Sequence, residues 1–154
     1  MVDVMYVASA GGHLSELLSL KPLFDKHKSI IITEKTASTL KLKDEFKLKY
    51  VAYTSRQYMF KHIFLFTYNI FKAIGYILKY RPKVIITTGA HTGGIFVTVG
   101  KILGRKTIYI ESMAKVESLS QTGKFVYNKV DRFYVQWEDL AKKYEKCEYL
   151  GRLK

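Results

Sequence analysis

Apolar residues along the chain follow two alternating patterns. Short runs of β-branched and aromatic residues indicate strands, and longer segments with apolar residues three or four positions apart indicate helices. The runs predict strands from Val4 onward and at 29–33, 50–53, 84–87, 106–110, 131–136 and 148–150. The segments predict helices at 14–26, 57–80, 95–103, 123–129 and 138–146, and a loop or short helix at 36–47.

Strands and helices in alternation predict an α/β fold with a Rossmann-like parallel sheet and helices on both faces. The connections between the first strands are too long for hairpins, which favours parallel pairing through crossover helices. A length of 154 residues with 48% hydrophobic content suits a single domain over 1–154. Cys147 is the one cysteine, so an internal disulfide is excluded and a small buried hydrophobe is expected.

The first strand runs into the small residues Ala10, Gly11 and Gly12, which are followed by His13. Two glycines leave no side chain between a ligand and the backbone, and the first amides of the next helix carry partial positive charge. The turn therefore suits phosphate or another anion, with His13 at its mouth as a candidate for proton transfer. Neither the dinucleotide fingerprint nor the P-loop is present, so a plain tight turn with a packing histidine is the alternative.

A second turn of small residues follows the strand at 84–87. Its candidate ligand-binding residues are Thr88, Gly89, His91, Thr92, Gly93 and Gly94. In an open parallel sheet, ligands collect at the carboxyl ends of the strands, where the strand order reverses. Two such turns side by side at that edge predict a site for an anionic ligand.

The formal net charge of +13 is distributed unevenly along the chain. Between 46 and 110 there is no Asp or Glu, whereas eleven lysines and arginines fall there. A middle half of one sign predicts an anionic partner, and a generic basic surface is the alternative. No helix-turn-helix, RNP-type aromatic motif or set of zinc ligands is present, which argues against nucleic acid as that partner.

The segment 57–80 is richer in apolar and aromatic residues than one buried stripe requires. Its lysines and its glycine argue against a membrane-spanning helix, but aromatic bulk with lysines is typical of a helix that lies in a membrane interface. The alternative is a long crossover helix packed on the sheet. The residues expected to contact an anionic membrane surface are Phe60, Lys61, Phe64, Tyr68, Phe71, Lys72 and Lys79.

Glu111 is the first acidic residue after 65 positions without one, and it follows the strand at 106–110. With Ser112 beside it, this carboxylate stands where it can accept hydrogen bonds from ligand hydroxyls; capping of the next loop or pairing with a lysine is the alternative. There is no cluster of carboxylates for a divalent cation, so no metal is expected. No basic and apolar leader precedes the first strand, so a cytoplasmic location is expected.

Three stretches resemble a known family: YVASAGGHLSE at 6–16, IESMAKVESLSQTGK at 110–124 and VDRFYVQW at 130–137. Together they resemble the acceptor-side subunit of a split glycosyltransferase. In eukaryotes that subunit recruits a UDP-N-acetylglucosamine transferase to a dolichol-linked acceptor, and bacterial counterparts of CpsF or PssD type serve capsule and exopolysaccharide assembly. More distantly, the order of these features is similar to the N-terminal half of MurG.

The resemblance implies the N-terminal half of an inverting GT-B glycosyltransferase. A small partner subunit would bind the UDP-sugar, this chain would bind no cofactor, and the acceptor would be a polyprenyl-diphosphate-linked saccharide. Backbone amides at 10–12 and 89–94 would hold the diphosphate, and the lipid would run along 57–80. His13 is the first candidate for the base that takes the acceptor's proton, and Glu111 is the second.

The eukaryotic subunit's N-terminal membrane helix is absent here, so attachment is expected to be peripheral, at the cytoplasmic face of the plasma membrane. Two other functions stay open on the sequence. One is a non-catalytic membrane adaptor that only recruits and activates the partner. The other is a free-standing nucleotide-binding enzyme, which would need a fingerprint motif and an acidic ribose ligand. No activity is expected of the chain alone.

Overall fold

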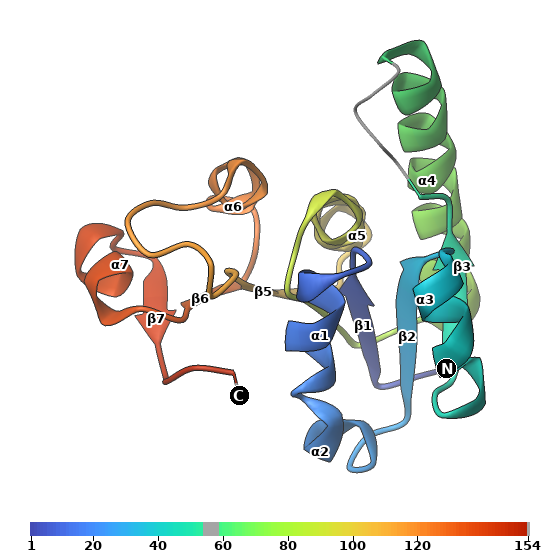
Figure 1. Ribbon diagram of the computed structural model, residues 1–154, viewed down its shortest axis with the longest axis horizontal. Coiled ribbons are helices and arrows are strands. Elements are labelled where there is room, and N and C mark those ends of the chain that lie inside the picture. The colour runs from blue at the N-terminus through green and yellow to red at the C-terminus, as the bar shows by residue number, and fades with distance from the viewer. Residues whose placement is uncertain (54–58, 154) are drawn as a thin grey trace.

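A computed structural model describes residues 1–53 and 59–153, and the side chains of 59–62 are outside that description. The described residues form a seven-stranded sheet in the order β3-β2-β1-β4-β5-β6-β7, with every neighbouring pair parallel (Figure 1). The predicted α/β class is confirmed. The strands are β1 Val4–Ala8, β2 Ser29–Glu34, β3 Leu48–Val51, β4 Val84–Thr87, β5 Lys106–Ile110, β6 Arg132–Val135 and β7 Cys147–Tyr149.

Helices connect the strands and cover the two faces of the sheet. They are α1 Gly12–Leu18, α2 Lys21–Phe24, α3 Ala37–Leu40, α4 Met59–Tyr80, α5 His91–Ile102, α6 Gln121–Val126 and α7 Glu138–Lys143, with a 3-10 turn η1 at Lys41–Asp44. The regular succession of β–helix–β units explains the parallel pairing, because each crossover returns the chain to the same end of the sheet.

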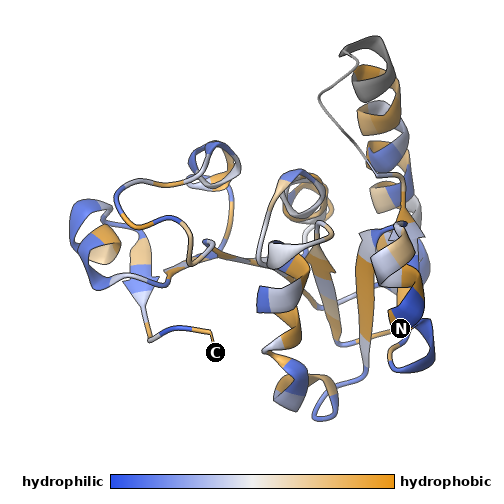
Figure 2. Cartoon of the chain, in the orientation of Figure 1, coloured by the Kyte–Doolittle hydropathy of each residue, from blue (hydrophilic) through white to orange (hydrophobic). Residues whose placement is uncertain are grey.

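The core lies on both sides of the inner strands. Successive side chains of a strand point to opposite faces, so Met5 and Val7 of β1 belong to a core cluster that includes buried residues of α4 to α7, while Tyr6 and Ala8 belong to a second cluster with residues of α1 and α2. Figure 2 shows β1 and β2 as hydrophobic along their length. A strand buried on both faces is typical of a parallel sheet covered by helices.

The strand order reverses between β1 and β4. These two strands are neighbours although two other strands separate them in the sequence, and the chain then continues to β5, β6 and β7 on the far side. Because both strands run in the same direction, the turns that follow them meet at one edge of the sheet. The prediction that the two small-residue turns lie side by side is confirmed.

Several predicted boundaries differ from the structure, among them the ends of the helices predicted at 123–129 and 138–146, and three of the differences have identifiable reasons. The helix predicted at 14–26 is two helices, because Pro22 lacks an amide hydrogen and fits only the first turn of a new helix. The third strand is Leu48–Val51 rather than 50–53, since Leu48 and Val51 supply its buried positions. The helix predicted from 95 begins at His91, so the second half of the second turn is helical.

Candidate functional site

Two reciprocal hydrogen bonds join the turns after β1 and β4. The Nδ1 atom of His13 lies 2.8 Å from the backbone oxygen of Thr88, and the Thr88 hydroxyl donates to the backbone oxygen of His13 at 2.6 Å. The Ser9 amide also donates to the Gly89 carbonyl at 3.0 Å. These bonds hold the half-buried imidazole at the point where the strand order reverses, which is where ligands bind in open α/β sheets.

The contact with Thr88 fixes which ring nitrogen of His13 carries the hydrogen. A carbonyl oxygen can only accept, so Nδ1 donates, and in the neutral ring Nε2 is then the nitrogen with the lone pair. Gly89 leaves the room for this ring. It has a φ of +96°, and a Cβ atom there would lie 3.2 Å from both His13 Nδ1 and the Tyr109 hydroxyl oxygen. The imidazole is therefore arranged to accept a proton through Nε2.

Glu34, which was not predicted from the sequence, connects the turn after β1 to the turn after β4. Its carboxylate accepts from the Ala10 amide at 3.2 Å and from the Thr92 hydroxyl at 2.8 Å, and the residue is 3% exposed. Glu34 is the last residue of β2, one position beyond the predicted end of that strand. A carboxylate directly after a buried strand at the ligand-binding edge is a signal that could have revealed it.

Glu111 is fully buried, with a relative exposure of 0%. One carboxylate oxygen accepts from the Ser112 amide at 3.0 Å, and the other accepts from the Ser120 amide at 2.9 Å and its hydroxyl at 3.0 Å. Burial raises the pKa of Glu111, and the hydrogen bonds from Ser120 and Ser112 oppose that rise. With both oxygens occupied inside the protein, this side chain holds the loop between β5 and α6 and has no open path to an acceptor hydroxyl.

The hydroxyl of Ser112 also serves the structure of the rim. It donates to Glu16 of α1 at 2.9 Å, and the same carboxylate oxygen accepts from the Met113 amide at 3.0 Å. Glu16 thus ties α1 to the loop after β5, as Glu34 ties the first turn to α5. Three strand ends, those of β1, β4 and β5, are consequently fixed to one another by polar contacts.

Several backbone amides predicted to bind the diphosphate already have acceptors within the protein. The amide of Ala10 donates to Glu34, that of Gly89 donates to the Thr87 hydroxyl at 3.0 Å, and that of Gly94 donates to the Ala90 carbonyl at 3.0 Å. Gly11 and Gly12 differ from these, because both are exposed and a Cβ atom on either would meet nothing within 4 Å. The open backbone of the rim therefore lies at Gly11 and Gly12.

Gly93 and Gly94 are buried packing positions in the first turn of α5. A Cβ atom at Gly93 would collide with the Thr87 hydroxyl, and one at Gly94 would lie 2.7 Å from the Thr122 methyl carbon. Glycine at these positions brings α5 close to β4 and α6. His91 is half-buried in the same turn, and Thr92 is buried with its hydroxyl on Glu34.

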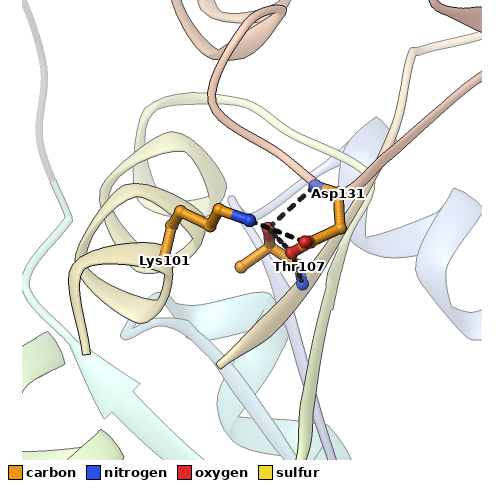
Figure 3. Close-up of polar contacts among 3 residues, drawn as sticks. All are labelled: Lys101, Thr107 and Asp131. Carbon is orange, nitrogen blue, oxygen red and sulfur yellow. Dashed lines mark hydrogen bonds and ion pairs between the residues drawn. The ribbon is translucent and has the colours of Figure 1, made fainter. Parts of the chain in front are cut away.

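The opposite end of α5 is fixed to the sheet by Asp131, as Figure 3 shows. Lys101 of α5 lies 2.6 Å from one carboxylate oxygen, and the other accepts from the amide and the hydroxyl of Thr107 at 2.9 and 3.0 Å. Burial disfavours the charged form, but the hydrogen bonds from Lys101 and Thr107 outweigh it and lower the pKa of Asp131. The helix that carries the second turn is thus held at both ends.

The long helix α4 presents an apolar stripe to solvent opposite its buried face. Its side facing the sheet holds Asn69, Ala73 and Ile77, all buried. At 100° per residue the opposite side holds 64, 68, 71, 75 and 78, and Phe64 and Phe71 there are 72% and 68% exposed. We call Phe64, Tyr68, Phe71, Gly75 and Leu78 the outer stripe of α4.

Cations flank the outer stripe of α4. The first half of this helix projects beyond the edge of the sheet where the two turns lie (Figure 1). The Lys72 ammonium stands 5.5 Å from the centre of the Tyr68 ring, and that contact raises the pKa of Lys72. Lys79 is exposed on the same flank. The side chains of Phe60 and Lys61 lie outside the described residues.

Within the described ranges, no group of three or more His, Cys, Asp or Glu residues is placed to hold a metal ion. The helices of that part of the chain also include none that is both long and apolar enough to cross a membrane. Cys147 is buried and unpaired, as expected, and burial raises its pKa to about 11.

The solved structures similar to this chain share its fold. Acinetobacter baumannii MurG matches 87% of this chain with a TM-score of 0.70 at 14% identity, over 41% of its own length. S. aureus MnaA, in a structure with UDP, matches 99% of this chain with a TM-score of 0.74 at 11% identity, over 46% of its length. The fold is therefore that of GT-B glycosyltransferases and epimerases, and this chain spans under half the length of each of these two proteins.

Sequence relatives agree with one another in their description. The Schizosaccharomyces pombe protein "UDP-N-acetylglucosamine transferase subunit alg14" is 47% identical over 75 residues, which are 46% of this chain and 36% of the relative. The Rattus norvegicus protein of the same description is 27% identical over 179 residues, 99% of this chain and 83% of the relative. A family model matches residues 4–153. With nearly the whole chain matched, this protein belongs to the family described as "Oligosaccharide biosynthesis protein Alg14 like".

Proposed function

We propose that this chain is the acceptor-binding, membrane-recruiting subunit of a two-polypeptide inverting glycosyltransferase. Its partner binds a UDP-sugar, and the sugar moves onto a polyprenyl-diphosphate-linked saccharide in capsule or exopolysaccharide synthesis, as in CpsF- or PssD-type systems. The observation that carries the proposal is the pair of bonds between His13 and Thr88, which sets an imidazole between two turns at the reversal of the strand order. Family membership supports the reaction class.

In this proposal the diphosphate of the acceptor binds over Gly11 and Gly12. Neither glycine has a side chain, the space beside each is open, and the adjacent start of α1 adds the partial positive charge of a helix N-terminus. Thr92 and Glu34 do not contact the ligand and instead keep the two turns in register. The proposed diphosphate site is therefore smaller than the predicted one. It comprises the exposed glycine pair and the adjacent starts of α1 and α5, instead of all of 10–12 and 89–94.

His13 serves as the base. Its Nε2 atom accepts the proton of the acceptor hydroxyl while the oxygen attacks the anomeric carbon of the sugar and UDP leaves with the electrons of the broken bond. The hydrogen bond from Nδ1 to Thr88 orients the ring and stabilises the imidazolium that results. Glu111 acts indirectly, because its carboxylate fixes the Ser112 and Ser120 amides of the neighbouring loop.

The outer stripe of α4 provides the contact with the membrane. Exposed phenylalanines enter the boundary between headgroups and acyl chains, and lysines on the flank attract anionic lipid. Since the same half of α4 projects past the rim that carries His13, membrane contact brings that rim to the lipid-linked acceptor at the cytoplasmic face.

The partner subunit covers the open face of the sheet. In the described part of the chain no helix lies over β5 and β6 on the side of α1, and an apolar groove of about 350 Å³ remains there. Its floor includes Ile86, Ile108 and Ile110, which are half-buried. The residues of β1 on the same face, Tyr6 and Ala8, are fully buried. An exposed apolar patch on a sheet is a feature of protein interfaces.

The variant His13→Asn tests the proposal. The Asn side-chain amide can still donate to Thr88, but the proton-accepting Nε2 is gone, so kcat of the complex with its partner should fall about 10²- to 10⁴-fold while KM stays within about threefold. His27→Asn, at an exposed position outside the rim, is the control and should leave both constants unchanged. The assay is sugar transfer from UDP-N-acetylglucosamine to a lipid-diphosphate-linked N-acetylglucosamine.

The same assay separates the adaptor function. A non-catalytic adaptor would keep its kcat in His13→Asn and would lose recruitment when Lys72 and Lys79 are changed together to Gln. The burial of Glu111 favours keeping the adaptor as a second candidate function. Of the two predicted bases only His13 can reach a substrate, so the catalytic role of this chain depends on His13 alone. Full turnover in His13→Asn would therefore transfer all of the chemistry to the partner.

A further inference from the structure

An apolar groove runs between α4, α5 and α6, on the other side of the sheet from the open face that we assign to the partner. Figure 1 shows α5 between the other two helices, and α5 contacts both of them. The groove has a volume of about 440 Å³, and none of the described side chains that line it is charged. Its apolar lining comes from Phe66 and Ile70 of α4, Ile95, Val99 and Ile102 of α5, and Phe125 of α6.

The groove begins at the proposed acceptor site and ends in solvent. His91 and Gly94, which line one end, belong to the first turn of α5, directly after the loop bonded to His13. Ile102, which lines the other end, is the last residue of α5 and is 78% exposed. At 1.5 Å of rise per residue these ends lie about 16 Å apart. The groove is thus a continuous apolar path leading away from the rim.

The shape and chemistry of the groove fit a hydrocarbon chain. A peptide strand placed there would bring backbone N–H and C=O groups that need partners, and the middle of the groove offers Ile95, Val99 and Phe66. A branched aliphatic chain has no such requirement and gains free energy with each buried carbon. Three of the polar lining residues, His91, Gln121 and Thr122, lie where α5 and α6 begin, at the end nearest the rim, and Thr98 lies in the middle of α5.

A cation stands beside this path. Lys129 lies 3.0 Å from the centre of the Phe125 ring that forms one wall, whereas Lys101, near the far end of α5, is paired with Asp131. Neither α5 nor α6 contains an acidic residue. The surroundings of the groove therefore attract an anionic amphiphile.

We propose that this groove binds the first isoprenoid units of the lipid-diphosphate acceptor. The diphosphate sits at the rim beside His13, and the chain lies along α5 and leaves the groove past Ile102. The inference rests on the proposed function and adds to it a lipid site within the protein, distinct from the outer stripe of α4. That stripe contacts the bilayer, whereas the groove selects an acceptor by its chain.

Isothermal titration of the full chain with farnesyl diphosphate and with methyl diphosphate tests this site. The wild type should bind farnesyl diphosphate at least about tenfold more tightly, because the chain adds buried apolar area. Val99→Trp fills the groove and should abolish that preference while leaving methyl diphosphate binding unchanged. Leu78→Trp, on the outer stripe, is the matched control and should keep the preference.

The other outcomes each decide a different point. Equal binding of the two diphosphates by the wild type overturns the groove and leaves the proposed acceptor site standing. Binding of neither compound removes the diphosphate site itself, and the groove with it. A preference that survives in Val99→Trp places the chain elsewhere, and a dimer of the wild type that this substitution dissociates assigns the groove to a second copy.

A second measurement does not depend on the folding of a variant. A farnesyl diphosphate analogue with a photoreactive terminal group, irradiated with the wild-type chain, should label peptides from α5 and α6. Labelling restricted to α4 positions of the outer stripe would contradict the proposal.

Discussion

Removing the carboxylate of Glu34 tests whether the two turns of the rim behave as one unit. Glu34→Ala leaves the Ala10 amide and the Thr92 hydroxyl without the acceptors that now lie 3.2 and 2.8 Å away. Glu34 and Thr92 are 3% and 1% exposed, so water cannot replace the lost acceptor without a rearrangement. The expected result is a loss of stability together with a displacement of the first turn from α5.

The size of the loss follows from the two bonds. A hydrogen bond to a charged group contributes about 1.5–3 kcal/mol, so two contribute about 3–6 kcal/mol. Part of this is offset, because the variant no longer buries a carboxylate, and a net loss of about 2–4 kcal/mol is expected. Glu34→Gln keeps one acceptor oxygen and should lose about half as much. Glu45→Ala, at an exposed position, is the control and should change stability by less than about 0.5 kcal/mol.

Urea unfolding of the full chain measures these differences, with the variants compared at equal slope. A double-mutant cycle with Thr92→Val isolates the contact between the two side chains and should give a coupling of about 1–2 kcal/mol. If Glu34→Ala unfolds at the same urea concentration as the wild type, or if the coupling is absent, then Glu34 does not join the turns.

Three further experiments test other parts of the structure. Gly93→Ala places a Cβ atom on the Thr87 hydroxyl and should lower the free energy of unfolding, measured with urea, by about 1–3 kcal/mol. Gly75→Ala lies on α4 with open space around it and should raise that free energy by about 0.5–1 kcal/mol. Equal effects of the two substitutions would contradict the close packing of α5. Asp131→Asn should cost about 1–3 kcal/mol at neutral pH. Because the folded pKa of Asp131 lies below its unfolded value, this contribution is lost as pH falls through the folded pKa, so wild type and variant should converge in acid; a constant difference would refute the ion pair. Ile108→Glu should weaken co-purification with the partner at least about tenfold while the chain alone keeps its melting temperature within a few degrees, and undiminished complex formation would remove the partner from that face.

The arrangement of the sheet could be predicted from the sequence because its cause is local. Strands buried on both faces read as continuous apolar runs, and the long connections between them permit little besides parallel pairing. The two turns were predicted at one edge for the same reason, and the bonds between His13 and Thr88 confirm that placement.

What the sequence concealed depends on contacts between distant positions. Gly93 and Gly94 looked like an open loop, yet both belong to the first turn of α5. They are glycines because a larger residue would not fit against Thr87 and Thr122. Glu111 looked accessible at a strand end, and it is enclosed by a loop whose path the sequence did not indicate. The groove beside α5 likewise forms only when three helices come together, so no single segment predicted it.

In the proposed function, the acceptor's diphosphate binds at Gly11 and Gly12, beside His13. A titration of the isotopically labelled chain with a short-chain polyprenyl-diphosphate-N-acetylglucosamine, followed by proton–nitrogen NMR, observes those amides directly. We expect saturable downfield shifts of the Gly11 and Gly12 amide signals, while the signals of Gly104 and Gly151, equally open but outside the rim, stay in place. Shifts confined to other residues, with Gly11 and Gly12 unmoved at saturation, would contradict it.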